Sequence, residues 1–520
     1  MAPCFILEAL KYFAPVFFLK MFHERRKILS IIFPILILLV SPAAIVAATA
    51  STTAASGSGM RPSLPFYSVY YSSSMSSPQP SPYCQTGLGV IVCYTPQDIK
   101  RAYNYPNYLD GTGQTIVIVD AFGSPTVQSD LNTFDSTFGL PPTTIQIVCQ
   151  GGTCPTGVPS NGDQLSWTEE IALDTQYAHA MAPGAHIVLF VATSDDDLVL
   201  EQAVLQAVKE FPHSIISQSF GDPEQDLQEG TCTLTPGLCT PAYVQQVLST
   251  GEAAYALAAI KGDTVFASAG DYGADNSPLG FTEANPSYPS SSPWVTAVGG
   301  TMGNPYSLPV VPSCGGRTCS TGLVTFLNTA SCQLNALPPY TTAPSCTPVG
   351  YGAEQVWNEK LLGIATGGAP SLYFPVPLYQ LGLGLTSRTT PDVSYNAAVD
   401  GGVFGYWTAG ESFVPPVKGG FYIFGGTSAG SPQWSAIAAL ADQLAMQDHR
   451  GTIGFINPTL YLIGHNSFLY NRDFHDITVG NNIVAGSTIG FSAQRGWDDA
   501  SGWGTPNVAN LVPDLVQLSL

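Results

Sequence analysis

Short apolar runs alternate with amphipathic segments along the chain from about residue 94 to residue 300. Nearly continuous apolar runs of four to eight residues are typical of strands buried on both faces of a parallel sheet. Such runs lie at 115–120, 186–191, 214–220, 264–267 and 295–298. Helical periodicity occupies the intervals near 97–103, 168–182, 197–210 and 242–260. Buried strands that alternate with helices predict an α/β domain with a mainly parallel sheet.

A loop of small residues at 425–432 ends the apolar run 421–424 and precedes a helix. The helix is indicated by Pro432 in the first turn and by apolar residues at helical spacing from Trp434 to Ala445. Ser428 therefore lies at a strand-to-helix turn, where the positive end of the helix dipole favours an anion. We expect an exposed hydroxyl mounted as a nucleophile; the alternative is a glycine-rich turn whose serine caps the helix.

Glu170 and Asp174 are four residues apart on the predicted helix, which places them one turn apart on the same face. Two such carboxylates repel each other unless they share a proton or pair with a cation, and no Lys or Arg occurs between residues 151 and 208. We therefore expect a coupled pair in which one group has a raised pKa. The alternative is a solvated acidic face, although the rest of this helix is mainly apolar.

A third polar feature is the Gly-Asp-x-Gly turn at 270–273, which directly follows the strand predicted at 264–267. This turn places Asp271 at the carboxyl end of a parallel strand, where α/β enzymes keep catalytic groups. Taken alone, Asp271 is equally well interpreted as an ordinary turn aspartate.

Composition indicates one large, loop-rich domain with appendages. The 520 residues are 45% hydrophobic and 10% charged, with 52 Gly and 42 Pro. Acidic residues outnumber basic ones by 37 to 17, and no basic cluster follows residue 50, so nucleic acid is not an expected partner. Because few Lys and Arg would remain charged once the carboxylates are protonated, the composition also favours acidic surroundings.

The N-terminal region has the pattern of a secretory signal. Arg25, Arg26 and Lys27 precede an apolar stretch at 28–40 and small residues that end at Ala50. We expect residues 1–50 to be a signal peptide cleaved after Ala50, with Met21 as a possible start, or alternatively a membrane anchor. Residues 51–92 are rich in Ser, Pro and Tyr and are interpreted as a linker or extended arm, and residues 93–520 as the folded domain.

Cysteine spacing supports export. Apart from Cys4, ten cysteines fall into near-neighbour pairs, which predicts five local disulfides, although spacing alone does not fix their connectivity. The pairs in chain order are Cys84/Cys93, Cys149/Cys154, Cys232/Cys239, Cys314/Cys319 and Cys332/Cys346. A reduced cytosolic chain is the alternative, and no Cys/His set has zinc-site spacing.

These motifs together resemble the sedolisin family, the serine-carboxyl peptidases with a subtilisin-like fold. The resemblance rests on the Glu-x-x-x-Asp segment 170–174, the turn at 270–273 and the Gly-Thr-Ser-Ala segment 426–429. Segments 217–221, 298–301 and 391–394 also match, and coverage extends from about residue 94 to residue 506. It implies an α/β, subtilisin-like fold with a mainly parallel central sheet flanked by helices and a calcium-binding C-terminal loop region.

The resemblance also implies a role for each site residue. Ser428 would attack the scissile carbonyl, Glu170 would be the general base, and Asp174 would orient Glu170 and share its proton. Asp271 would be protonated and would donate a hydrogen bond to the oxyanion. This mechanism requires acidic pH, because a carboxylate base and a neutral Asp271 are available together only well below neutral pH.

The implied function is that of a secreted, acid-active endopeptidase, expected to be monomeric, that acts on polypeptides. The alternatives are a tripeptidyl exopeptidase of the same family and a catalytically inactive surface or binding protein that keeps the fold. A Ser-His-Asp triad is disfavoured, because His179 is nine residues from Glu170 and so lies on the opposite side of the helix. Membrane association is expected only if the N-terminal segment stays uncleaved.

The family also implies one bound Ca²⁺ ion, held entirely by oxygen atoms as calcium requires. Two carboxylates and three backbone carbonyls would bind it, from Asp476, Ile477, Gln494, Gly496 and Asp498. Gln494 stands where the family commonly has glycine, which affects backbone conformation but not the donor atom. The alternative is a pair of ordinary loop aspartates.

Overall fold

The computed structural model of the chain describes residues 89–229, 241–276, 283–304 and 350–519. It also describes short strands at 61–62, 69–70, 83–86, 313–314, 317–318, 320–321 and 324–325. The predicted signal peptide or anchor lies outside these residues. None of the helices that the structure describes is long and apolar enough to cross a membrane.

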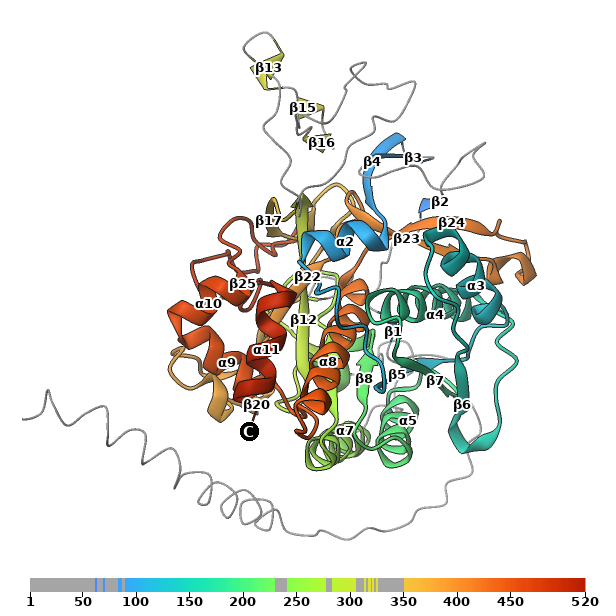
Figure 1. Ribbon diagram of the computed structural model, residues 1–520, viewed down its shortest axis with the longest axis horizontal. Coiled ribbons are helices and arrows are strands. Elements are labelled where there is room, and N and C mark those ends of the chain that lie inside the picture. Colours follow the sequence, from blue (N-terminus) through green and yellow to red (C-terminus); the bar gives the residue numbers. More distant parts are fainter. Residues whose placement is uncertain are drawn as a thin grey trace, which may run out of the picture. The chain divides into compact units, whose positions relative to one another are not determined.

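An eight-stranded sheet organises the described chain (Figure 1). Its strand order is β17-β12-β10-β8-β5-β7-β6, and β22 also pairs with β12. The strands are β5 (Thr115–Ala121), β6 (Gln146–Cys149), β7 (His186–Ala192), β8 (Ile215–Gln218), β10 (Thr264–Ser268), β12 (Thr296–Asn304), β17 (Ala353–Val356) and β22 (Val393–Asn396). Every pairing is parallel except that of β12 with β17. The predicted α/β fold with a mainly parallel sheet is therefore confirmed.

Helices cover both faces of this sheet, as the side chains of β5 show. Ile116 and Ile118 pack into one hydrophobic core with α4 (Gly162–Met181) and α8 (Gly430–Gln447). The alternate residues Val117 and Val119 pack into a second core with α5 (Asp197–Glu210) and α7 (Pro241–Lys261). Because both faces are buried, the strand sequence is almost continuously apolar instead of alternating.

Local chemistry explains where the predicted boundaries differ from the structure. Helix α4 begins six residues before the predicted start near 168, because the Asn161 side chain accepts a hydrogen bond from Gln164 N at 2.8 Å and caps the helix. The apolar run 214–220 forms two strands, since β8 ends at Gln218 and β9 (Phe220–Pro223) joins a different sheet. Ser219 lies between them.

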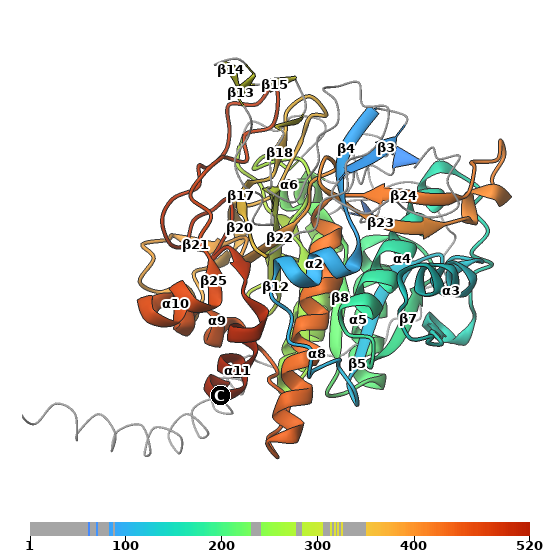
Figure 2. The ribbon, with the colours of Figure 1, turned by 45° about the horizontal axis from the view of Figure 1, so that its top comes forward.

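A second sheet leads into the glycine-rich loop. Its order is β2-β24-β23-β4-β3, and β24 (Gly420–Phe424) runs antiparallel to β23 (Gly402–Trp407). Figure 2 shows β3 (Tyr83–Thr86) and β4 (Gly89–Tyr94) beside these strands. β2 (Val69–Tyr70) pairs with β24, and β1 (Arg61–Pro62) pairs with β9. Strands from the region 51–92 thus pair with the rest of the domain.

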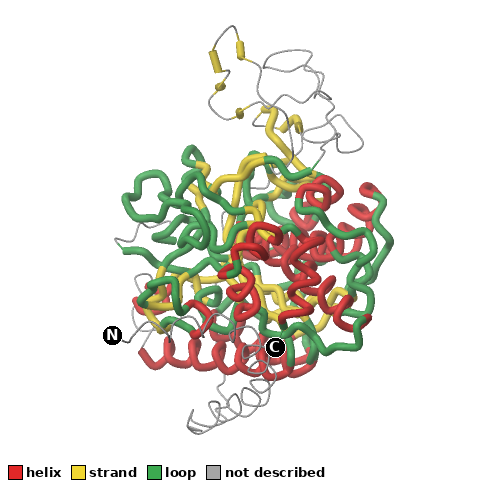
Figure 3. The backbone as a smooth tube through the Cα atoms, turned by 60° about the vertical axis from the view of Figure 1, so that its left-hand side comes forward, coloured by secondary structure: helices red, strands yellow, loops and turns green. Residues whose placement is uncertain are grey.

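The remaining elements are short and are joined by many loops, which Figure 3 shows in green. The helices are α2 (Pro96–Ala102), α3 (Val127–Phe138), α6 (Glu224–Glu229), α9 (Asn457–His465), α10 (Ser467–Asp473) and α11 (Val508–Leu518). The strands are β11 (Ser287–Tyr288), β13 (Ser313–Cys314), β14 (Arg317–Thr318), β15 (Ser320–Thr321), β16 (Val324–Thr325), β18 (Asn358–Glu359), β19 (Ile364–Ala365), β20 (Pro370–Pro375), β21 (Ser387–Thr389), β25 (Phe474–His475) and β26 (Thr505–Pro506).

One of the predicted disulfides is present between Cys149 and Cys154, with their Cα atoms 5.0 Å apart. Cys93 is also disulfide-bonded. The predicted pairs Cys232/Cys239, Cys314/Cys319 and Cys332/Cys346 lie wholly or partly outside the described residues.

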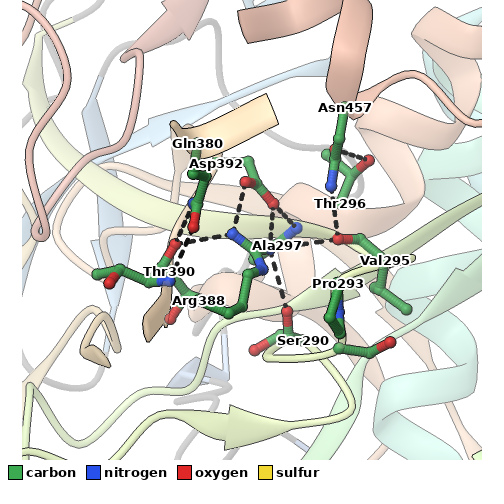
Figure 4. Close-up of polar contacts among 12 residues, drawn as sticks. Ser290, Pro293, Val295, Thr296, Ala297, Gln380, Arg388, Thr390, Asp392 and Asn457 are labelled. Carbon is green, nitrogen blue, oxygen red and sulfur yellow. Dashed lines mark hydrogen bonds and ion pairs between the residues drawn. The ribbon is translucent and has the colours of Figure 1, made fainter. Parts of the chain in front are cut away.

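A buried ion pair joins three parts of the fold (Figure 4). Arg388 on β21 binds both carboxylate oxygens of Asp392, at 2.7 and 2.5 Å, and both side chains are fully buried. Asp392 also accepts hydrogen bonds from Ala297 N on β12 at 2.8 Å and from the Tyr461 hydroxyl on α9 at 2.8 Å. The pair therefore fixes β21 and α9 against the central sheet.

We predict that Arg388→Met lowers the free energy of unfolding by about 3–5 kcal/mol, because it leaves the Asp392 carboxylate buried without its cation. The measurement is urea denaturation at pH 5. Arg472→Met is the comparison variant: the Arg472 side chain is 37% exposed, so water screens its pairs with Asp473 and Asp514, and we expect a smaller loss although Asp473 itself is buried. Equal losses in the two variants would contradict a dominant role for the buried pair.

Candidate active site

Ser428 lies in a tight turn between β24 and α8. A one-turn 3₁₀ helix, η6 (Thr427–Ala429), follows Gly425 and Gly426 and leads directly into α8. Gly426 has φ 101°, a conformation that other residues rarely adopt. A Cβ on Gly425 would lie 2.8 Å from the carbonyl oxygen of Ala398. Both glycines are therefore needed for the predicted strand-to-helix turn.

The Ser428 side chain is fully buried, so the expectation of an exposed hydroxyl is wrong. It is covered because η6 packs against α4 as well as against strands β10, β12 and β22. The Ser428 hydroxyl donates a long hydrogen bond of 3.4 Å to the carbonyl oxygen of Ser219. Ser219 follows β8 directly, so the end of a central strand lies beside the serine.

Glu170 and Asp174 are both fully buried on α4. The Ser219 hydroxyl donates a hydrogen bond of 3.0 Å to Asp174 Oδ1. Neither Glu170 oxygen has a partner within hydrogen-bonding distance among the described residues. The two carboxyls therefore lie in a dry environment, which contradicts the alternative of a solvated acidic face.

Burial raises the pKa of Glu170 well above its ordinary value, and the negative charges of Asp174, Asp120 and Asp271 raise it further. The nearby Ser428 hydroxyl opposes that rise, although it is too far away for a full hydrogen bond. Burial likewise raises the pKa of Asp174, with a further contribution from Asp120, against the hydrogen bond from Ser219 and the nearby Glu170 carboxyl, which lies too far away for a full hydrogen bond. The group therefore retains protons to an unusually high pH.

Asp120 is a member of this group that sequence reasoning missed. It lies near the carboxyl end of β5, is fully buried, and neither of its oxygens has a hydrogen-bond partner within the described chain. Burial raises the pKa of Asp120 to about 8. The available signal was its position at the end of a buried parallel strand, the same signal that identified Asp271.

Asp271 occupies the turn after β10 and faces the loop that bears Ser428. Its Oδ1 accepts hydrogen bonds from Thr427 N at 2.8 Å and from the Thr427 hydroxyl at 2.7 Å. Oδ2 is buried and has no partner among the described residues. Burial raises the pKa of Asp271 to about 7, against the effect of both Thr427 contacts. Below that pH a proton on Oδ2 is available for donation.

His179, the histidine of the disfavoured alternative triad, takes no part in this group. Its Nε2 donates a hydrogen bond of 2.9 Å to the carbonyl oxygen of Pro141 and lies 3.4 Å from Asp135 Oδ1. Its ring therefore serves the packing of α3 against α4. The arrangement around Ser428 depends on carboxyl groups.

The predicted calcium ligands lie in loops that follow α10. Asp476 Oδ1 accepts hydrogen bonds from the Tyr470 hydroxyl at 2.8 Å and from Gly496 N at 3.1 Å. Asp498 Oδ2 accepts hydrogen bonds from Gln494 N at 2.8 Å and from the Ser501 hydroxyl at 3.2 Å, and its Oδ1 accepts from Ala500 N and Ser501 N, each at 2.9 Å. Burial raises the pKa of Tyr470, and the hydrogen bond to Asp476 and the charges of Asp476 and Asp498 raise it further, so both acids lie near this hydroxyl.

The chemistry of the predicted donors fits a hard cation, because all five are oxygen atoms and the two carboxylates form no ion pair in the described chain. The predicted set differs from a cluster of ionisable side chains, since three of its ligands are backbone carbonyls. The described residues hold no group of three or more His, Cys, Asp or Glu positioned to bind a metal, so the calcium site stays a prediction.

Comparison with protein-family models finds no match. Among curated proteins, kumamolisin from Bacillus sp. (strain MN-32) is 30% identical over 417 residues, which are 79% of this chain and 62% of kumamolisin. Tripeptidyl-peptidase 1 from Canis lupus familiaris is 27% identical over 84% of this chain and 67% of its own length. The chain thus spans only about two thirds of these relatives.

Among solved structures, the Pseudomonas sedolisin, a serine-carboxyl proteinase complexed with two molecules of pseudo-iodotyrostatin, superposes with a TM-score of 0.61. It is 25% identical to this chain, and the match covers 83% of this chain and all of the sedolisin. Similarity in sequence and similarity in fold both point to the sedolisin family of serine-carboxyl peptidases.

Proposed function

We propose that this protein is a secreted, acid-active serine-carboxyl endopeptidase. The observation that carries the proposal is the convergence of one serine and a set of buried carboxyls at the ends of β5, β8 and β10. In such a site a carboxylate, and not a histidine, is the general base. Carboxyl groups with a raised pKa keep the protons that catalysis at acidic pH requires. Similarity to the sedolisin family and to tripeptidyl-peptidase 1 supports a polypeptide substrate.

In the proposed reaction, Ser428 Oγ forms a bond to the scissile carbonyl carbon while its proton passes to Glu170. Glu170 then returns the proton to the leaving amine as the peptide C–N bond breaks, and water hydrolyses the resulting ester by the reverse roles. Asp174 shares a proton with Glu170 and is itself held by Ser219. Because the coupled pair holds one proton, which can reside on Asp174, Glu170 keeps an unprotonated oxygen that can accept the proton of Ser428.

Asp271 would stabilise the negative oxygen that forms during the attack. Thr427 fixes one carboxyl oxygen of Asp271, so the proton must reside on the other, unpartnered oxygen. A neutral acid in a dry site is a strong donor and costs no reorganisation at the moment of reaction. This role ends as the pH rises through the Asp271 pKa of about 7.

A calcium ion would be held by the Asp476 and Asp498 side chains with the carbonyls of Ile477, Gln494 and Gly496. When bound, the ion would cross-link two loops that are already joined by hydrogen bonds from Gly496 N to the Asp476 carboxylate. Its proposed role is to stabilise the fold.

The nucleophile is tested by Ser428→Ala. We expect hydrolysis of acid-denatured haemoglobin at pH 4 to be lost, because no attacking oxygen remains, while the circular dichroism spectrum and melting temperature stay close to those of the wild type. N-terminally blocked and free peptides, assayed in parallel, separate endopeptidase from tripeptidyl exopeptidase activity. Comparable turnover in the variant would overturn the assignment of Ser428.

The oxyanion donor is tested by Asp271→Asn and Asp271→Ala. The asparagine amide keeps a donor that needs no protonation, so we expect some activity to survive and the loss of activity at high pH to move upward or become less steep. The alanine variant should lose roughly 10²–10³ in kcat, the usual effect of removing such a donor. The measurement is the pH profile of kcat from pH 3 to 8.

Both variants are needed, because an asparagine that turns its oxygen toward the substrate would also be inactive. Thr427→Ser is the matched control: it keeps both contacts to Asp271 and should leave the profile almost unchanged. Wild-type turnover and pH dependence in Asp271→Ala would show that Asp271 has no catalytic role.

Calcium is tested by chelation at pH 5. We expect the melting temperature to fall after metal removal and to recover with Ca²⁺ but not with Mg²⁺, which demands a smaller octahedral site. The variant Asp498→Asn should melt lower and respond less to chelation. An unchanged melting curve after verified metal removal would leave Asp476 and Asp498 as ordinary loop residues.

A further inference from the structure

A second group of buried acids lies on the opposite face of the central sheet from Glu170. Glu201 on α5 is fully buried in the core formed by α5 and α7, together with Tyr255 of α7 and Tyr288 of β11. Gln218, the last residue of β8, points into the same group and is also fully buried. None of these residues has a role in the proposed reaction.

The Tyr255 hydroxyl is the centre of this group. It lies 3.0 Å from Glu201 Oε1, 2.8 Å from Glu201 Oε2 and 3.0 Å from Gln218 Oε1. A tyrosine hydroxyl has one proton to donate, yet all three neighbouring atoms are oxygens that accept. If Glu201 is ionised, at least one short oxygen–oxygen contact therefore has no proton between its atoms.

A proton on Glu201 resolves this arrangement. The Glu201 carboxyl then donates to Tyr255, and Tyr255 donates to Gln218, so that a hydrogen bond joins each pair of neighbouring residues in the chain of three. Only one of the two Glu201 oxygens carries the proton, so the other contact with Tyr255 is not a hydrogen bond. Turning the Gln218 amide over would supply another donor, but it would leave an ionised Glu201 buried with no ion pair in the described structure. The protonated form is therefore favoured.

The surroundings of Glu201 strengthen this conclusion. Burial raises the pKa of Glu201, and the charges of Glu252 on α7 and Asp197 on α5 raise it further, against the hydrogen bond from Tyr255. Glu252 itself has a pKa raised to about 7 by burial, and Glu224 of α6 adds to that. A Cβ on Gly251 would lie only 2.5 Å from Glu201 Oε2, so the backbone of α7 closes tightly over the carboxyl.

Gln218 connects this group to the active site. Ile216 and Gln218 face α5 and α7, whereas Ser217 faces α8, where its hydroxyl lies 3.0 Å from that of Ser431. The next residue, Ser219, turns toward α4 and donates its hydroxyl to Asp174. The position of Gln218 at the end of β8 therefore sets where Ser219 meets both Asp174 and Ser428.

We propose that protonated Glu201, Tyr255 and Gln218 form a latch that positions Ser219, and through it Asp174, and that opens when Glu201 loses its proton. The latch residues are positioning residues, since none of them touches Ser428. The inference rests on the proposed role of Asp174 for its effect on catalysis, but the latch itself is a property of the fold. The latch would keep the active site ordered only at acidic pH. This effect would be independent of the titration of the catalytic carboxyls.

The sign of the pH effect follows from linkage. Because the folded protein holds the Glu201 proton more tightly than the unfolded chain, the latch contributes its full stability below the ordinary glutamate pKa of 4.5. That contribution is lost as the pH rises from this value through the raised pKa of Glu201. The end of β8 should therefore loosen in the same pH range.

Hydrogen exchange of the full chain tests the latch in the Ser428→Ala background, which prevents self-digestion. Protection factors for peptides spanning β8 and β9, corrected for intrinsic exchange, should fall between pH 4 and pH 8 by roughly tenfold for each unit by which the Glu201 pKa is displaced in that range. In Glu201→Gln the new amide donates to Tyr255 at every pH, so this fall should disappear. Peptides from β7 provide the internal reference.

Two further variants keep the test decisive. Tyr255→Phe removes the hydroxyl that joins Glu201 to Gln218 but keeps Glu201. The end of β8 should therefore lose protection from hydrogen exchange already at pH 4. Glu252→Gln removes a neighbouring acid that does not contact Tyr255, so the fall should persist, with its midpoint moved down by less than about one pH unit. An undiminished fall in Glu201→Gln, or full protection in Tyr255→Phe at pH 4, would overturn the latch. Neither result depends on enzyme activity, so failure of the latch is distinguishable from failure of the proposed function.

Discussion

The site depends on one constraint, the burial of several carboxyl groups around Ser428 without a cation. Glu170, Asp174, Asp120 and Asp271 are all at most 1% exposed, and no ion pair in the described chain involves any of them. An ionised carboxylate in such a place costs several kcal/mol, so the folded protein favours protonated forms. The burial that excludes water from the site thus also raises the pKa of its carboxyl groups, and so favours activity at acidic pH.

The fold buries these carboxyl groups by placing the carboxyl ends of three strands beside the turn η6, which glycines precede. β5, β8 and β10 are parallel neighbours, so their carboxyl ends bring Asp120, Ser219 and Asp271 to one edge of the sheet. Helix α4 supplies two acids from one face, and η6 can approach them because glycines precede it. Thr427 then satisfies one oxygen of Asp271, which leaves the other with the proton.

Sequence patterns predicted those parts of the structure that depend on local order. Helix α5 occupies the predicted range 197–210, and β5, β7 and β10 differ from prediction by one residue each, because buried parallel strands and amphipathic helices leave a periodic signal. The spacing of Glu170 and Asp174 likewise placed both on one face. The burial of Ser428 was not predictable, because it results from four elements distant in sequence that pack on η6.

The roles of Ser219, which lies in the matching segment 217–221, and of Asp120 were not predicted for the same reason. Ser219 has no unusual neighbours in sequence, and its importance comes from a contact to Asp174, 45 residues away. Asp120 ends an ordinary buried strand, and only its packing beside α4 gives its charge an effect on Glu170. Pairwise contacts between elements of this kind leave no periodic trace in a single sequence.

The protein buries acids in two physically different ways, and the difference has a consequence for its pH dependence. Asp392 is compensated by Arg388, so its ionised form is stabilised in the core. Glu170 and Glu201 have no such partner in the described chain, so the same burial favours their neutral forms. A rise in pH therefore leaves the ion pair that fastens β21 and α9 intact while it charges the groups on both faces of β8. The fold should consequently lose order first around β8 and the active site, with the C-terminal helices still docked.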